Sequence, residues 1–460
     1  YLVPDKTPII IFDLNISKKK NVFSSQDLLK KISNTYIKMS SSNANNASLL
    51  YVDLSTQISE DSLAVFGGAD AVNIFVSVFR KVINHSPIPI AHRLYSGTAN
   101  FNNSVEFSIT RVGDYVTHSW LRVVFPAIST NGTGTLRWTD DLMQSLISHL
   151  SFTFTDLEVY KFDHHFINFW ANHTVPESKW NAYQRMIGNN GALNVLAGTQ
   201  AQTALQVPLP MFYARRSDDG ANAALPVASV PFNELRCKID FRNYSDLIEY
   251  GGGATSANLS PATPTLVRVE MWSNYVIVPV EHRVVMSKIE RDYWIEQVQT
   301  SYTTFTTTAG TTNSHDVRHP YIVKYFAFAV QNQATATRFT DYTSALIKAS
   351  GSDTIDTASL LYDNTARLSS MPVDYFAFTE AFYKWPAVSR DVGWYSYSYA
   401  HDPFSVKHTG GTNLSVLANT TWQLTPSTAI TATAPSSRVV MMTINSQVIK
   451  IRKGSGGFLS

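Results

Sequence analysis

The stretch Val105–Phe125, which reads VEFSITRVGDYVTHSWLRVVF, indicates how this chain folds. Its first residues alternate apolar with polar, at Val105, Phe107 and Ile109, and this period of two places every second side chain on one face of a strand. Gly113-Asp114 then forms a turn pair, and the extended pattern resumes up to Phe125. The stretch therefore predicts antiparallel β structure.

Further strand-like segments follow in both halves of the chain. Residues 266–278 contain no strand breaker, and residues 321–331 are aromatic and β-branched. Residues 375–385, which are rich in aromatic side chains, are also interpreted as strand-like, and residues 438–452 as an extended pair around Asn445-Ser446. We therefore predict an all-β fold, mainly β with short helices in loops.

Two short helices are predicted between the strands. Thr139 is a candidate cap for a helix that carries Asp140 and Asp141 in its first turn and an apolar face that continues to Leu150. Residues 281–294 change to helical spacing. Because 460 residues exceed the usual size of one domain, we place a domain boundary in this second helical segment.

A weak internal repeat supports a duplicated architecture. Residues 150–154, followed by Trp170 and Pro176, are similar in arrangement to residues 358–362, followed by Trp385 and Pro386. The repeat predicts that both halves share one kind of β domain.

The N-terminal residues differ from the rest. Because the chain opens on Tyr1, residues 1–38 are either part of a processed product or an extension upstream of a start at Met39. Met39 opens a polar low-complexity stretch, which is typical of an extended arm rather than of a domain.

The composition favours association with other proteins. Charged residues make up only 16% of the chain, against roughly 25% in an average soluble domain, so copies of it repel one another weakly. The net charge is +2, and the only basic block is Lys18-Lys19-Lys20, so direct nucleic-acid binding is not predicted. The longest apolar runs are too short to span a bilayer.

The sequence does not predict a metal site at any of its histidine or cysteine positions. His164-His165 follows Asp163, but adjacent histidines in a strand point to opposite faces, and no second ligand pair has suitable spacing. His315 to His319 is interpreted as a solvated loop. Cys237 is the only cysteine, which excludes an intramolecular disulfide and a cysteine-based zinc site and is compatible with a reducing compartment.

Catalytic and cofactor motifs were also considered. Asp140-Asp141 fits a helix start and Asp218-Asp219 a polar turn, so neither pair suggests glycosidase carboxylates. Gly251-Gly252-Gly253 and Gly410-Gly411 lack the residues of a phosphate-binding loop. We predict no catalytic, cofactor-binding or metal-binding residues, no cofactor and no enzymatic activity.

An ordered series of sequence blocks resembles a known family, the major capsid proteins of iridoviruses and marseilleviruses, which are large nucleocytoplasmic DNA viruses. The blocks cover residues 99–123, 136–139, 152–156, 186–189, 207–212, 230–236 and 444–458. The resemblance runs from about Leu50 to the C-terminus. It implies a double jelly roll, two consecutive eight-stranded β-sandwiches, and a homotrimer that forms a pseudo-hexameric capsomer of an icosahedral capsid.

The resemblance also sets expectations for organisation and partners. We expect an N-terminal arm over residues 1–60, a first jelly roll over 61–281, a helical linker over 282–294 and a second jelly roll over 295–460. The expected partners are further copies of the chain, neighbouring capsomers, and minor capsid, penton and inner-membrane-associated proteins. The expected location is the outer capsid shell of the virion, assembled in the host cytoplasm.

The alternative is a jelly-roll carbohydrate-binding protein, because lectins use the same sandwich. Under this hypothesis, exposed aromatic residues such as Trp394 and Tyr395 would stack on sugars.

Overall fold

The computed structural model describes residues 82–132, 134–189, 191, 193–214, 224–345, 348–433, 435–452 and 454–458, together with Ser55 and Phe75. Residues 1–81 and 82–460 are separate compact units, and the account below concerns the second. The predicted arm over residues 1–60 and the Asp218-Asp219 pair therefore fall outside the described residues, apart from Ser55.

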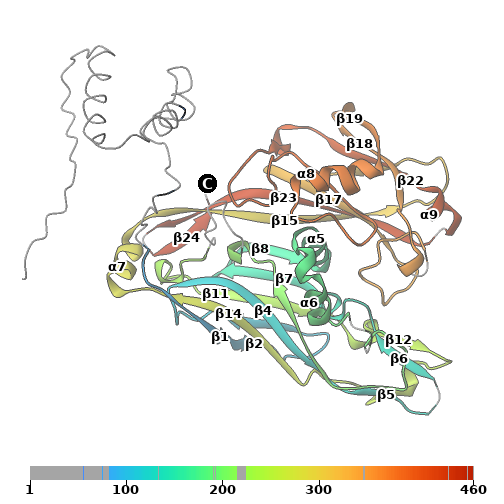
Figure 1. The fold of residues 1–460 in the computed structure, drawn as a ribbon, viewed down its shortest axis with the longest axis horizontal. Helices are drawn as coiled ribbons and strands as arrows, with labels where there is room; N and C mark the ends of the chain where they lie inside the picture. The colour runs from blue at the N-terminus through green and yellow to red at the C-terminus, as the bar shows by residue number, and fades with distance from the viewer. Residues whose placement is uncertain are drawn as a thin grey trace, which may run out of the picture. The chain divides into compact units, whose positions relative to one another are not determined.

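The two largest sheets in the first half of this unit are antiparallel (Figure 1). One sheet has the order β1-β14-β4-β10, and the other has the order β2-β3-β11-β7-β8. The strands are β1 (Ser86–Ala91), β2 (Arg93–Ser96), β3 (Ser104–Ser108), β4 (Tyr115–Phe125), β7 (Ile147–Phe154), β8 (Leu157–Asp163), β10 (Thr203–Leu209), β11 (Leu235–Phe241) and β14 (Arg268–Ile277).

The second half repeats this plan. Its sheets have the orders β15-β23-β17-β20 and β16-β22-β18-β19. The strands are β15 (Arg291–Phe305), β16 (Asn313–Asp316), β17 (Ile322–Asn332), β18 (Ile355–Tyr362), β19 (Thr365–Pro372), β20 (Trp394–Ser398), β22 (Thr420–Pro426) and β23 (Ser437–Arg452).

Both halves have the same strand topology. The correspondence is clear when β1 and β2 are counted as one bent strand and the eight main strands of each half are numbered 1 to 8 along the chain. Each half then has one sheet of order 1-8-3-6 and another that contains the order 2-7-4-5. In each half a helix follows the fifth strand, which is β8 in the first and β19 in the second. The all-β double jelly roll is thus confirmed, and so is the duplication that the weak repeat predicted.

Short strands and helices occupy the connections. The short strands are β5 (Ile128–Thr130), β6 (Thr135–Trp138), β9 (Thr199–Gln200), β12 (Ile248–Gly251), β13 (Leu259–Ser260), β21 (Thr412–Asn413) and β24 (Ser455–Phe458). The helices are α4 (Leu142–Leu146), α5 (His164–Thr174), α6 (Glu177–Ile187), α7 (Val280–Lys288), η7 (Tyr375–Thr379), α8 (Glu380–Lys384) and α9 (Thr428–Thr433).

The alternation in the sequence explains the main strands of the first half. In β4, Leu121, Val123 and Phe125 are buried, whereas the residues between them are partly exposed. In β14 the same alternation buries Met271 and Tyr275. The buried set of each strand faces the opposite sheet, and this interior is the core of the sandwich.

Two predicted helices differ from the structure. The helix expected from Thr139 begins only at Leu142 and ends at Leu146, and strand β7 follows directly. Asp141 precedes this helix in the left-handed conformation and makes no capping hydrogen bond, and the first turn of the helix contains no acidic residue. The helical spacing predicted over 281–294 forms α7 only as far as Lys288, and β15 begins at Arg291.

Two interpretations in the second half are wrong. Residues 375–385 are not a strand, because η7 and α8 form consecutive helical turns there. Residues 438–452 are not a pair of extended segments. They belong to one strand, β23, in which Asn445 and Ser446 stay in register with Gln297 and Glu296 of β15.

Candidate assembly surfaces

The β15-β23-β17-β20 sheet is buried on both of its faces. Along β17, Phe326, Phe328 and Val330 belong to the core of the second jelly roll. The alternate residues Tyr325, Ala327 and Ala329 join the same apolar cluster as the core of the first jelly roll. The first jelly roll therefore covers the outer face of this sheet, which explains why β17 is a nearly continuous hydrophobic run.

Helix α5 makes much of this contact (Figure 1). The Phe169 ring lies 6.2 Å from that of Tyr325 and 5.4 Å from each of Trp385 and Trp394, measured between centroids. Trp394 Nε1 donates a hydrogen bond to Asn168 Oδ1 at 2.7 Å. Because aromatic burial of this kind contributes strongly to packing energy, these side chains stabilise the contact between the two jelly rolls.

A polar cluster lies at the N-terminal end of α5. Asp163 caps the helix by accepting from the Phe166 amide, and Tyr302 Oη of β15 donates to its other oxygen at 2.6 Å. His165 Nδ1 and Tyr342 Oη share a hydrogen bond of 2.7 Å. The cluster thus joins side chains of both jelly rolls by satisfied hydrogen bonds.

Burial and nearby cations keep the histidines of this cluster neutral. Burial lowers the pKa of His165 to about 3, and Arg438, whose Nη2 lies 3.4 Å from His165 Nε2, acts in the same direction. Burial also holds the pKa of His164 well below its usual value, helped by His165 and by Arg242. Desolvation and positive neighbours both disfavour the protonated form.

The structure corrects the environment predicted for the candidate metal ligands. His164 and His165 open helix α5 rather than lying in a strand, and both are buried. His315 lies in β16 and is also buried, so the solvated-loop interpretation is wrong. Within the described parts of the chain, no group of three or more His, Cys, Asp or Glu side chains is arranged to hold a metal ion.

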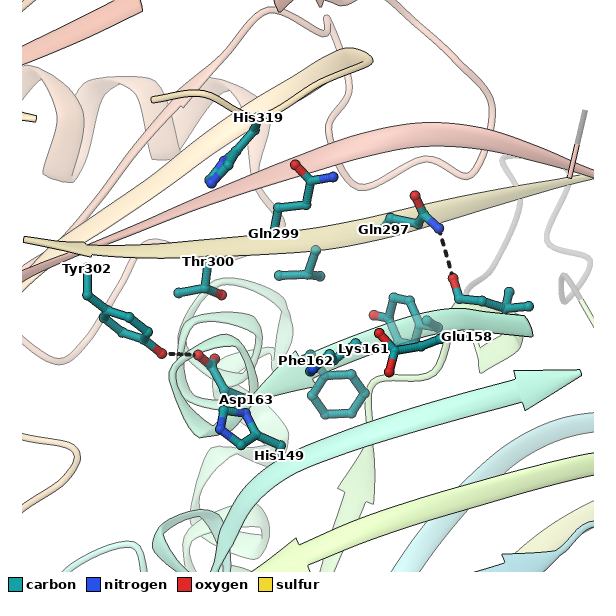
Figure 2. A pocket seen from close by; sticks show the side chains of 13 residues that line it. His149, Glu158, Lys161, Phe162, Asp163, Gln297, Gln299, Thr300, Tyr302 and His319 are labelled. Atoms are coloured by element: carbon teal, nitrogen blue, oxygen red, sulfur yellow. Dashed lines mark hydrogen bonds between the residues drawn. The ribbon is translucent and has the colours of Figure 1, made fainter. Parts of the chain in front are cut away.

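A cleft of about 440 Å³ lies between β8 and β15, beside the polar cluster (Figure 2). Glu158, Lys161 and Asp163 line it from β8, and Gln297 and Tyr302 from β15. The two strands are joined at one end by the Gln297 amide, which donates to the Val159 carbonyl at 3.0 Å, and at the other by the Tyr302–Asp163 contact. The cleft is therefore a gap in the contact between the jelly rolls.

Ion pairs connect the loops of the two jelly rolls. The carboxylate of Glu249 in β12 pairs with two arginines. Its Oε2 lies 2.7 Å from Nη2 of Arg137 in the first jelly roll, and its Oε1 lies 3.1 Å from Nε of Arg338 in the second. These contacts outweigh the cost of burying Glu249 and lower the pKa of its carboxyl group. Asp141, which the sequence analysis placed in the first turn of a helix, instead makes contacts with the second jelly roll. Its Oδ2 accepts a hydrogen bond from the Thr340 hydroxyl and lies 3.4 Å from Lys348 Nζ.

An aromatic surface that the sequence did not predict lies on η7 and α8. Phe378, Phe382 and Tyr383 are 54%, 72% and 79% exposed, whereas Phe376 and Ala381 on the opposite side are buried. The sequence analysis missed this surface because it interpreted the segment as a strand. In a helix, Phe378 and Phe382 are four positions apart and therefore lie on one face. Contiguous exposed aromatic side chains are typical of protein–protein contact sites.

The residues proposed for sugar stacking are not available for it. Trp394 is 1% exposed and Tyr395 is fully buried. Trp394 packs against α5, and Tyr395 Oη donates to Asp353 inside the second jelly roll. The prediction that exposed Trp394 and Tyr395 stack on sugars is therefore wrong.

Two family models match consecutive parts of the chain. The model described as the major capsid protein N-terminus matches residues 73–278. The model described as the large eukaryotic DNA virus major capsid protein matches residues 282–457. No helix among the described residues has the length and apolar character needed to cross a membrane.

Similar proteins and structures agree with these matches. The major capsid protein of Costelytra zealandica iridescent virus is 33% identical over 91% of this chain and 99% of its own length, and that of Simulium iridescent virus is 34% identical over 83% and 86%. The Faustovirus major capsid protein has a TM-score of 0.71 at 11% identity, covering 93% of this chain and 98% of its own. A capsid chain of the PBCV-1 virus has a TM-score of 0.70 at 20% identity, covering 84% and 100%. With matching family models, relatives above 30% identity and the same duplicated fold, this chain belongs to the major capsid proteins of large eukaryotic DNA viruses.

Proposed function

We propose that three copies of this chain form a capsomer with pseudo-sixfold symmetry, and that such capsomers tile the icosahedral shell of the virion. The observation that carries this proposal is the presence of two jelly rolls of identical topology in one chain. Three chains related by a threefold axis then supply six similar lobes, and a six-lobed unit can tile a flat hexagonal array.

The composition and the packing support a purely structural role. The low charged fraction of 16% limits repulsion between copies. In the described parts of the chain, the histidines and acids first considered as catalytic or metal-binding make internal contacts instead. We propose that the chain has no catalytic, cofactor-binding or metal-binding residues and does not bind nucleic acid directly.

We propose the following organisation for the assembled particle. Residues 1–60 act as an arm beneath the capsomer, residues 61–281 and 295–460 form the two lobes, and residues 282–294 link them. The partners are neighbouring capsomers and minor capsid, penton and inner-membrane-associated proteins. Assembly of this outer shell takes place in the host cytoplasm.

Electron microscopy of the purified full-length chain tests this function. The proposal expects particles with a hexagonal outline, because six lobes of similar size surround one axis. A glycan array on the same preparation tests the carbohydrate-binding alternative and is expected to show no saturable binding. Single-chain particles that bind a defined sugar would overturn the proposal.

A further inference from the structure

Two adjacent histidines at the start of α5 lie inside the contact between the two jelly rolls. The rings of His164 and His165 are buried, and their centroids are 3.8 Å apart. His165 Nδ1 shares the 2.7 Å hydrogen bond with Tyr342 of the second jelly roll. The His164 ring lies 5.9 Å from the ring of Phe339, which also belongs to the second jelly roll. The protonation state of this pair therefore affects how well α5 packs against the second jelly roll.

Two arginines determine which nitrogen of each ring must accept a hydrogen bond. His165 Nε2 lies 3.4 Å from Nη2 of Arg438, and His164 Nδ1 lies 3.0 Å from Nη2 of Arg242. A guanidinium group has donors only, so the ring nitrogen that faces it must be the unprotonated one. A proton added there would place a second donor against the arginine and break the hydrogen bond. Because Arg438 belongs to β23, its bond to His165 is one of those that join the two jelly rolls.

The surroundings of the pair are poorly suited to further positive charge. In the described parts of the chain, the charged and titratable groups that face the pair are His149 of β7, Asp163 before α5, Arg242 after β11, Tyr302 of β15, Tyr342 after β17 and Arg438 of β23. Asp163 is the carboxylate of this set, and both of its oxygens already accept hydrogen bonds, one of them from Tyr302 (Figure 2). The N-terminal end of α5 adds a positive partial charge. Protonation of the pair would therefore bring cations together without a free counter-charge.

The second jelly roll has a core that does not depend on this contact. Phe326 and Phe328 of β17 lie in an apolar cluster between the sheets of the second jelly roll, separate from the cluster that contains the contact. On the other side of β17, Tyr325 and Ala327 face the first jelly roll. Separation of α5 from this side would expose a sheet face, but it would unpair no strand. The contact can therefore open without unfolding either sandwich.

We propose that His164 and His165 form an acid-sensitive switch: when the pair takes up protons, α5 separates from the outer sheet face of the second jelly roll, and both sandwiches keep their strands. At neutral pH both rings are neutral and accept hydrogen bonds from the arginines. In acid, the bond between His165 and Arg438 is replaced by repulsion between two cations. The switch lies within one chain and does not depend on the proposed trimer.

The pH range of the switch follows from the direction of the pKa shifts. In the closed contact, burial lowers the pKa of both rings from the ordinary value of 6.5, to about 3 for His165. In the open form the rings meet water and regain the ordinary value. The contact therefore has its full stability above about pH 6.5 and loses it as the pH falls. Each histidine shifts the ratio of open to closed forms about tenfold per pH unit, so the pair shifts it about hundredfold.

A thiol buried in the contact would report its opening. Ala327→Cys places a thiol on the side of β17 that faces the first jelly roll, where Ala327 is fully buried. The native Cys237 lies in the core of the first jelly roll and reports global unfolding. The full-length chain is treated with dithiodipyridine, which reacts with thiols in acid, and peptide mapping identifies the labelled thiol. We expect the introduced thiol to become reactive as the pH falls, while Cys237 stays protected and the circular dichroism of the strands is unchanged.

Removal of the two titrating rings should remove most of the response. In the same reporter chain, the double variant His164→Gln, His165→Gln should weaken the pH dependence of labelling by about hundredfold per pH unit below about pH 6, after correction for the reactivity of a free thiol. His165→Gln alone should weaken it by about tenfold and replaces the double variant if that chain does not fold. The matched control is His92→Gln, because His92 is also buried but bonds to Ser273 within the first jelly roll. This control should leave the labelling of the introduced thiol unchanged.

Three results would overturn the switch. If the introduced thiol and Cys237 became reactive together, acid would unfold the whole chain rather than open the contact. If both histidine variants kept the pH dependence of the reporter chain, other groups would control the opening. If the introduced thiol stayed unreactive down to about pH 4, the contact would not open in acid.

Discussion

The buried histidines make the stability of this protein sensitive to acid. His165 has a folded-state pKa of about 3 and His92, His173 and His319 each of about 4, all lowered mainly by burial from the ordinary value of 6.5. Below pH 6.5 the unfolded chain therefore binds more protons than the folded chain, and the free energy of unfolding decreases as the pH falls. Each histidine contributes a slope of about 1.4 kcal/mol per pH unit within its window.

His165→Gln isolates one of these contributions. We expect the free energy of unfolding of the variant to depend less on pH than that of the wild type, by about 1.4 kcal/mol per pH unit between roughly pH 6 and pH 4. Arg438, Arg242 and Asp163 are the charged groups around this side chain and are present in both proteins. Denaturant titrations at several pH values measure the difference, and identical slopes would show that His165 does not titrate as described.

Cys237 is predicted to have a packing role only. It is fully buried in β11, between Phe107 of β3 and Phe152 of β7, and burial raises the pKa of its thiol. Cys237→Ser should still assemble, but it should lose about 1–3 kcal/mol of stability because a hydroxyl group is buried among apolar side chains. Size-exclusion chromatography of the variant measures its assembly, and its denaturation midpoint measures the loss of stability. Loss of capsomers in a variant that remains folded would contradict a packing role.

Helix α5 couples the two jelly rolls, and Phe169 is its central contact. Phe169→Ala removes a ring that packs against Tyr325, Trp385 and Trp394, and it should reduce the free energy of unfolding by about 3–5 kcal/mol. Val416→Ala, at a side chain that is 79% exposed, should change it by less than about 0.5 kcal/mol. Differential scanning calorimetry of both variants measures the costs. Equal small effects would mean that α5 does not hold the jelly rolls together.

Strands that bury one face could be predicted from the sequence, because alternation identifies them. This holds for β4 and β14. Alternation could not identify strands that are buried on both faces. It also could not identify helical segments that carry aromatic residues both on the buried face and on the exposed face. Phe376 and Phe378 on η7 point to opposite environments, the core and the surface, and a local pattern of aromatics does not distinguish this from a strand.

Polar residues were the least predictable part of the candidate surfaces. His164, His165 and His315 resemble loop or ligand residues in the sequence, but they are buried and hydrogen-bonded across large sequence separations. His165 and Tyr342, for example, are 177 positions apart. The His165–Tyr342 pair depends on the packing of one jelly roll against the other, which no local pattern encodes.

The N-terminal arm is predicted to contribute to assembly rather than to folding of the jelly rolls. Deleting residues 1–38 should leave a folded trimer with an unchanged thermal midpoint, because residues 82–460, which contain both jelly rolls, form a compact unit of their own. Contacts with minor capsid proteins or neighbouring capsomers should weaken. Limited proteolysis and thermal unfolding of the truncated chain test this expectation, and a truncation that unfolds the monomer would contradict it.

The duplication of the jelly roll has its main consequence in assembly. One chain contains two jelly rolls of the same strand order, so the proposed trimer would have six similar lobes around its threefold axis. The weak repeat between residues 150–176 and 358–386 was one sequence signal of this duplication. The sequences of the two jelly rolls have diverged, whereas the strand order of both is the same.

The mass of the purified full-length chain in solution tests the central claim most directly. Multi-angle light scattering at micromolar concentration should give three times the mass of one chain, because the proposed capsomer contains three copies, each with two jelly rolls. A particle that remains a well-folded single chain over this concentration range would contradict the account.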